Sequence, residues 1–194
     1  MRSESKKIII GLTALPGGGK DYVADILIKE YGFYKISPGD IIREKMKKEG
    51  LTKITREEQQ DIQNRWRKEH GPDYIMQLCY ERMVETGKKR FVVPGIRFPR
   101  DIRFYRGLKD FEFYNIYIWA LRRIRYSRTT ERKRIDMPAS FCEFVKHDRR
   151  EEKIFNLKLT AKMSDFKLTN HINNDKSIVG KVGDMMKKIG CLKI

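Results

Sequence analysis

The segment spanning residues 14–21 constrains the fold more than any other part of the chain, because it reads Ala-Leu-Pro-Gly-Gly-Gly-Lys-Asp between two contrasting flanks. Residues 7–13 before it form a short apolar run typical of a buried parallel strand. Residues 21–31 after it carry apolar side chains at helical spacing. This order predicts a loop whose backbone N–H groups converge on phosphate oxygens, with Lys20 supplying a positive charge.

Two positions depart from the usual phosphate-loop pattern. Ala14 stands where the pattern begins with Gly, and Asp21 stands where it has a Ser or Thr whose hydroxyl binds Mg²⁺. A carboxylate is a good ligand for a hard cation, so Asp21 could hold magnesium directly or through a water. Alternatively, Asp21 favours the first turn of the helix through the helix dipole. Both interpretations remain open.

Apolar runs alternate with helical segments along the whole chain, which predicts an α/β fold with a central parallel sheet and covering helices. Between residues 39 and 89 the pattern is helical: a capping box at 55–58 opens a helix through residue 68, and a second helix covers 73–83. A last helix begins near residue 177 and is closed by Gly190. The predicted strands are 7–13, 33–37, 91–93, 114–120 and 166–169.

The composition restricts the partners and the compartment. The 194 residues suit one domain, and their 43 Lys and Arg against 26 Asp and Glu leave a net charge of +17. Such a charge favours an anionic partner, either a nucleotide and a small phosphorylated acceptor or a nucleic acid, although heat adaptation also enriches Lys and Glu. No apolar run approaches the length of a membrane span, and three scattered cysteines without CxxC spacing favour a reducing, cytoplasmic location.

Candidate phosphate ligands follow the second and third predicted strands, where a parallel sheet binds its ligands. Asp40 and Arg43 share a helix face, so they could hold a phosphate dianion or form a surface ion pair. Arg97 could hold a second phosphate group. A phosphoryl-transfer site normally has an Asp where this chain has Gly95. Either Asp21 compensates, another acid such as Asp101 reaches in, or the site binds nucleotide without efficient chemistry.

Arginines crowd the segment after the fourth predicted strand. Most of them fit a solvated helix face, but one or two could neutralise charge on a transferring phosphoryl group. We expect Arg125 or Arg128 to do so, with Arg132 and Arg134 on a mobile part. Asn170, at the end of the last predicted strand, could contact the adenine or simply form a turn.

Together these motifs resemble the P-loop nucleoside monophosphate kinase superfamily over nearly the whole chain. Gly19-Lys20-Asp21 is the variant of phage-type deoxynucleoside monophosphate kinases and animal-type phosphomevalonate kinases, and residues 39–43 are similar to the Gly-Asp-x-x-Arg motif of adenylate kinases. Residues 95–99 resemble the Asp-x-Arg-Phe-Pro segment of deoxynucleotide kinases and dephospho-CoA-kinase-like proteins, with Gly in place of the acid. Residues 165–170 and the Lys-Ser at 176–177 resemble the ending of that group.

The resemblance implies a three-layer P-loop NTPase fold, with a mainly five-stranded parallel sheet and helices on both faces. It implies a single domain over 1–194, with a helical acceptor-binding lobe at 39–89 and a lid at 125–147. The implied activity is ATP- and Mg²⁺-dependent phosphoryl transfer to the phosphate of a small acceptor, a nucleoside or deoxynucleoside monophosphate. Dephospho-CoA or another phosphometabolite is an alternative acceptor. A P-loop ATPase, or a nucleic-acid-binding protein with degenerate catalysis, is an alternative function.

The resemblance also implies roles for individual residues. The catalytic residues are Lys20, Arg125 and Arg128; the ATP-binding residues are Pro16, Gly17, Gly18, Gly19, Lys20, Asp21, Tyr22 and Asn170; the acceptor-binding residues are Asp40, Arg43 and Arg97; and the metal ligand is Asp21.

Overall fold

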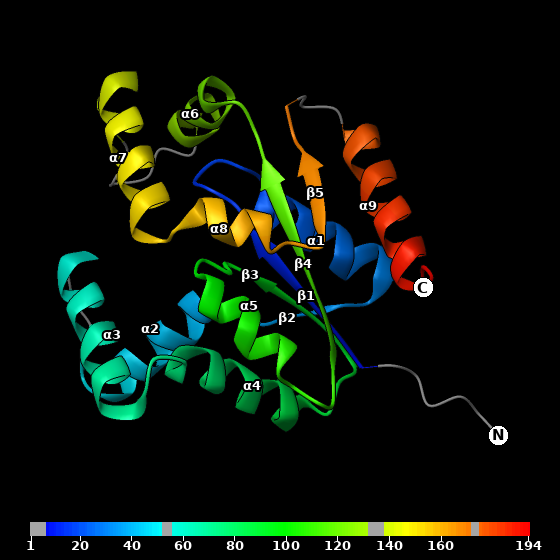
Figure 1. The fold of residues 1–194 in the computed structure, drawn as a ribbon, viewed down its shortest axis with the longest axis horizontal. Helices are drawn as coiled ribbons and strands as arrows, with labels where there is room; N and C mark the ends of the chain where they lie inside the picture. Colours follow the sequence, from blue (N-terminus) through cyan, green and yellow to red (C-terminus); the bar gives the residue numbers. More distant parts are fainter. Residues whose placement is uncertain (1–6, 52–55, 132–137, 172–174) are drawn as a thin grey trace.

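The structure is a computed structural model that describes residues 7–51, 56–131, 138–171 and 175–194. Five parallel strands form one sheet at its centre, in the spatial order β2-β3-β1-β4-β5 (Figure 1). The predicted parallel sheet and its strands are therefore confirmed, although the edge strand β2 is shorter than expected. The strands are β1 (Ile8–Thr13), β2 (Tyr34–Lys35), β3 (Arg90–Pro94), β4 (Glu112–Trp119) and β5 (Phe166–Thr169).

One face of the sheet is covered by α1 (Lys20–Tyr31) and α9 (Asp175–Ile189). Alternate residues of β1 point to opposite faces, so Ile8, Ile10 and Leu12 all pack with these two helices. All six residues of β1 are buried, as expected for a strand in the middle of a covered parallel sheet.

The other face is covered by helices that come mainly from the first half of the chain. Ile9 packs on this side with Phe91 and Val93 of β3, in one apolar cluster with the helices. Trp66 is 1% exposed and belongs to the same cluster, so it serves as packing. The contributing helices are α2 (Pro38–Lys48), α3 (Arg56–His70), α4 (Tyr74–Thr86) and α5 (Pro99–Arg106).

Three further helices complete the chain: α6 (Arg122–Glu131), α7 (Phe141–Ile154) and α8 (Leu157–Lys162). Figure 1 shows α6 and α7 beyond the carboxyl ends of the strands, while α2 and α3 lie apart from them at the lower left. The two groups of helices thus flank the strand ends at which α/β sheets bind ligands.

The helix boundaries follow local signals in the sequence. Ser37 caps α2 by accepting the Asp40 N–H, and Pro38 occupies the first turn, which cuts β2 short. Gly190, at φ 78°, follows the end of α9 as predicted. The predicted capping box at 55–58 lies partly outside the described residues. In the described part of the chain, no helix is long and apolar enough to cross a membrane.

Candidate active site at the carboxyl ends of the strands

The glycine loop lies between the end of β1 and the start of α1, as predicted. Gly17 (φ 75°) and Gly19 (φ 98°) both adopt left-handed backbone conformations, and Gly19 directly precedes the first turn of α1. Residues 14–21 line a cavity of about 210 Å³. The N-terminus of α1 therefore faces the cavity, where it offers backbone N–H groups to an anion.

The loop is held in place by a residue from the far end of the chain. Asn170, 4% exposed at the end of β5, donates from Nδ2 to the carbonyl of Gly18 at 3.0 Å. A Cβ on Gly19 would lie 2.2 Å from the same nitrogen. The sequence left adenine contact and a turn as alternatives for the Asn170 amide, and in the structure this amide supports the loop backbone.

Helix α6 approaches the loop just as closely at Gly17. A Cβ on Gly17 would lie 2.4 Å from the carbonyl oxygen of Arg125, which is backbone and cannot swing away. The glycine is required both by its φ and by this contact.

We expect Gly17→Ala to lower the free energy of unfolding by about 1–3 kcal/mol, since it combines an unfavourable φ with a clash against backbone. It should also weaken ATP binding, because α6 or the loop must shift to relieve the clash. Urea unfolding and ATP titration would measure both effects. The matched control is Gly180→Ala, on an exposed face of α9 with open space around the added methyl group. That change should be neutral or stabilising; equal behaviour of the two variants would contradict the close approach.

Lys20 and Asp21 form an ion pair with 2.8 Å between Nζ and Oδ2. Their side chains are 32% and 37% exposed, so a ligand in the cavity can reach both. Tyr22, by contrast, is partly buried and packs against the apolar core. The two charged residues thus face the cavity, whereas Tyr22 has a packing role.

A second and larger cavity, of about 780 Å³, opens beside the loop between α2, α3 and α5. Asp40 and Arg43 line it and pair with one another on the exposed face of α2, so the ion pair and the cavity position coexist. The two cavities share five lining residues. These are Lys20, Asp21, Gly95, Arg97 and Phe155.

The end of β3 explains why no acid stands there. Gly95 has φ 117°, a conformation that an Asp would adopt only with strain. Asp101 is 6% exposed, and its Oδ2 accepts the N–H groups of Arg97 (3.0 Å) and Phe98 (2.9 Å). Burial raises the pKa of Asp101, although these two N–H groups oppose the shift. This carboxylate thus shapes the 97–101 turn.

Magnesium would therefore rely on few protein ligands at this site. Within the described residues there is no group of three or more His, Cys, Asp or Glu side chains placed to hold a metal. Mg²⁺ commonly uses one or two carboxylates together with nucleotide phosphates and water. The Asp21 carboxylate at the cavity wall fits that mode of binding.

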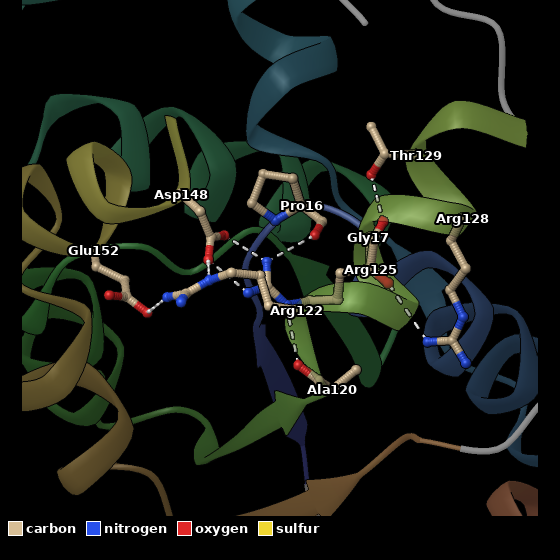
Figure 2. Close-up of polar contacts among 9 residues, drawn as sticks. All are labelled: Pro16, Gly17, Ala120, Arg122, Arg125, Arg128, Thr129, Asp148 and Glu152. Carbon is tan, nitrogen blue, oxygen red and sulfur yellow. Dashed lines mark hydrogen bonds and ion pairs between the residues drawn. The ribbon is translucent and has the colours of Figure 1, made fainter. Parts of the chain in front are cut away.

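Arg125 is tied to Asp148 of α7 by a buried, two-pronged ion pair (Figure 2). Nη1 lies 2.5 Å from Oδ1 and Nη2 lies 2.7 Å from Oδ2 of Asp148. The guanidinium also donates from Nε to the Ala120 carbonyl and from Nη1 to the Pro16 carbonyl, at 3.1 and 3.3 Å. All three guanidinium nitrogens of Arg125 are therefore bonded to the protein, and one of these bonds reaches the glycine loop.

Asp148 also forms an ion pair with a second arginine, Arg122. Arg122 donates from Nε to Asp148 Oδ2 at 2.8 Å and lies 3.8 Å from Glu152 (Figure 2). Burial alone would raise the pKa of Asp148, but hydrogen bonds and charge from Arg125 and Arg122 outweigh it and hold the pKa below its usual value. The carboxylate is thus ionised at neutral pH, and it joins α6 to α7.

Arg128 lies on the neighbouring turn of α6 and reaches over the loop. Its guanidinium donates to the carbonyl of Gly17 at 3.5 Å, and to the carbonyl and the side-chain oxygen of Asn170, both at 3.2 Å. Arg128 is therefore part-buried and lies close to the loop. Arg132 and Arg134 lie outside the described residues.

Comparisons with known proteins show the family to which the chain belongs. A profile of the AAA domain family matches residues 13–117, which include the glycine loop. The UPF0200 protein of Methanothermobacter thermautotrophicus is 34% identical over 145 residues, covering 74% of this chain and 72% of that protein. The UPF0200 protein of Pyrococcus abyssi is 32% identical over 166 residues, covering 84% and 87%.

Solved structures show the same fold. Shikimate kinase from Bacteroides thetaiotaomicron superposes with a TM-score of 0.61 at 11% identity, covering 94% of this chain and 98% of that one. Shikimate kinase from Acinetobacter baumannii, in complex with shikimate, has a TM-score of 0.59 at 16% identity and covers 96% of both chains. The predicted P-loop kinase-like fold is confirmed. The chain belongs to the AAA domain family and to the UPF0200 proteins, within the P-loop superfamily that is similar to the nucleoside monophosphate kinases.

Proposed function

We propose that this protein is an ATP- and Mg²⁺-dependent kinase that transfers a phosphoryl group to the phosphate of a small acceptor, a nucleoside or deoxynucleoside monophosphate. The observation that carries the proposal is the pair of adjoining cavities, one at the glycine loop and one beside α2 and α3, with Lys20, Asp21 and Arg97 in both linings. A donor phosphate in the first cavity and an acceptor phosphate in the second would meet at these three charges.

The loop and its lysine would bind the donor. Backbone N–H groups of Gly17, Gly19 and Lys20 would surround the ATP phosphates, whereas the Gly18 N–H donates to the Leu15 carbonyl. Lys20 would exchange its pairing with Asp21 for a phosphate oxygen. Asp21 would be the protein ligand of Mg²⁺, which neutralises phosphate charge when bound. Such a reaction depends on positioning and on cations, so it does not need a covalent nucleophile.

Arg43 and Arg97 would bind the accepting phosphate, and Asp40 would orient Arg43 through their ion pair. Four amide side chains of α3 line the same cavity and could recognise the edge of a base. They are Gln59, Gln60, Gln63 and Asn64.

The α6 arginines would have different tasks. Arg128, at the loop, would stabilise charge on the transferring phosphoryl group after releasing one of its protein partners. The guanidinium nitrogens of Arg125 all have protein acceptors. Arg125 would therefore act as a positioning residue that fixes Pro16 relative to α6. We further propose that 39–89 is an acceptor-binding lobe and 125–147 a lid, within one domain.

We expect Arg97→Gln to raise the KM for the acceptor by about 10- to 100-fold, since a charge-assisted bond to phosphate is lost. The KM for ATP should change by less than about threefold. Steady-state kinetics with each substrate varied in turn would measure this split. Arg103→Gln, an exposed α5 position outside both cavity linings, is the matched control. Equal effects on both KM values would contradict the assignment of Arg97 to the acceptor.

The assay that tests the function is ADP formation from Mg-ATP, with and without a panel of acceptors. The panel would contain each nucleoside and deoxynucleoside monophosphate, dephospho-CoA and phosphomevalonate. ADP formation that depends on one acceptor would support the kinase and identify its substrate. Hydrolysis at the same rate without any acceptor would indicate a P-loop ATPase instead. ATP binding without turnover would indicate degenerate catalysis, and binding of RNA or DNA with steep salt dependence should then be measured.

A further inference from the structure

Three arginines meet at the larger cavity from separate segments of the chain. Arg67 comes from α3, Arg97 from the turn after β3, and Arg100 from the first turn of α5. All three line the cavity beside Phe98 and Phe155. Arg97 and Arg100 are three residues apart, and Arg67 joins them from a distant helix, which points to a built site.

Aromatic rings hold these cations in place. The guanidinium carbons of Arg67 and Arg100 lie 6.0 and 4.3 Å from the centre of the Phe98 ring. The guanidinium carbon of Arg97 lies 4.8 Å from the centre of the Phe155 ring, and the two rings meet edge to face at 5.1 Å. Ring faces fix the position of a guanidinium without neutralising it, so its N–H groups stay able to bind an anion.

The positive charge of the cluster is poorly compensated. Among the residues that the structure describes, no carboxylate forms an ion pair with Arg67, Arg97 or Arg100. Asp101 lies close enough to act on Arg100 and on Arg67, but its Oδ2 accepts two backbone N–H groups of the 97–101 turn. Desolvation, followed by the charges of Arg100 and Arg97, lowers the pKa of Arg67. The cations therefore repel one another, and a bound anion would relieve this repulsion.

The arginines differ in their position relative to the glycine loop. Arg97 lines both cavities, whereas Arg67 and Arg100 line only the larger one of the two. An accepting phosphate must lie where the cavities join, which leaves Arg67 and Arg100 for another part of the same molecule.

We propose that the acceptor carries a second anionic group, a phosphate or a carboxylate, and that Arg67 and Arg100 bind it while Arg97 holds the accepting phosphate. This inference rests on the proposed function, and it narrows the substrate class to phosphorylated acceptors with two separated anionic groups. Among nucleoside monophosphates, those that carry a further phosphate or a carboxylate elsewhere on the molecule meet this condition.

The test measures binding rather than turnover, using protein saturated with Mg-ADP so that the probes enter the larger cavity. The probes are linear alkanediol bisphosphates of increasing chain length, each compared with the hydroxyalkyl monophosphate of the same length. A parallel series with a terminal carboxylate distinguishes the two anion types. We expect at least one length of one series to bind about tenfold or more tightly than its monoanionic partner.

Arg67→Gln and Arg100→Gln should each remove most of that gain and leave binding of the monophosphates within about threefold. Lys68→Gln on α3 and Arg103→Gln on α5 are the matched controls, because both side chains are exposed and lie outside the cavity lining. If Arg67→Gln and Arg100→Gln weakened binding of both members of each probe pair equally, all three arginines would serve one phosphate. That result would overturn the inference. So would the absence of a gain at every length. Failure of Mg-ADP to bind would instead overturn the proposed function.

Discussion

Lys20→Ala is expected to lower kcat by at least about 100- to 1,000-fold, because it removes a positive charge aimed at the transferring phosphate. The folded state should be almost unaffected. The Lys20 side chain is about one-third exposed, and its ion-pair partner is the equally accessible Asp21. Exposed pairs of this kind contribute about 0–1 kcal/mol. Steady-state kinetics and urea unfolding of the same preparation would measure both quantities.

Lys29→Ala is the matched control for this variant, since Lys29 is an exposed lysine of the same helix and lies outside both cavity linings. It should keep full activity. A Lys20→Ala protein that is folded and still turns over at the normal rate would show that the glycine loop is not the donor site.

Asp148→Ala is expected to give the largest loss of stability, about 3–5 kcal/mol, because it leaves the buried guanidinium of Arg125 without its counter-ion. ATP binding should weaken as well, since Arg125 also bonds the carbonyl of Pro16 in the loop. Asp184→Ala, at an exposed position of α9, should change the free energy of unfolding by less than about 0.5 kcal/mol. Urea unfolding and ATP titration would test both statements.

A double variant separates the lost charge balance from lost packing. Arg125→Met with Asp148→Leu replaces both members of the pair, and such replacements are often neutral or stabilising. We expect it to recover most of the stability but not ATP binding, because Arg125→Met removes the bond to the Pro16 carbonyl. A double variant as unstable as Asp148→Ala would contradict the ion-pair explanation.

The contribution of Asp148 to the free energy of unfolding also depends on pH in a defined way. Its pKa is held below the usual value of 3.8, so the stabilisation is fully present above that value and is lost as pH falls through the lower, folded-state pKa. The stability difference between the natural protein and Asp148→Asn should therefore persist down to about pH 4 and shrink only in more acidic solution. Urea unfolding across this acidic range would measure it.

Most of the sheet could be predicted from the sequence, because its strands are apolar runs with local signals at both ends. β5 matches its predicted bounds, and β1, β3 and β4 differ from theirs by at most two residues at either end. β2 differs more, since it is an exposed edge strand with little apolar pattern and Pro38 begins the next helix at once. The strand order follows from pairing across the chain, which no local pattern contains.

The candidate site was predictable where a motif is local and hidden where contacts are long-range. The glycine loop, the Asp40–Arg43 pair and the place of Arg97 all follow from short spacings. The partnership of Arg125 with Asp148 spans two helices, and nothing around position 148 marks that aspartate among the many charges of α7. The role of Asn170 as a support for the loop likewise depends on a bond across 152 positions of sequence.

The backbone conformation at Gly95 gives a physical reason for the absence of an acid at this position. Its φ of 117° requires glycine. Asp101, the third residue of α5, shapes the turn instead. The sequence shows the missing acid, but the backbone conformation that excludes it becomes visible only in the folded chain.

The most direct test of the proposed kinase is transfer of label from γ-³²P-ATP, followed under single-turnover conditions with excess enzyme and each acceptor of the panel. We expect the label to appear on the phosphate of one acceptor, with little release as inorganic phosphate, and we expect Lys20→Ala to abolish the transfer. Label that appears as inorganic phosphate at the same rate with and without every acceptor would contradict it and would identify an ATPase.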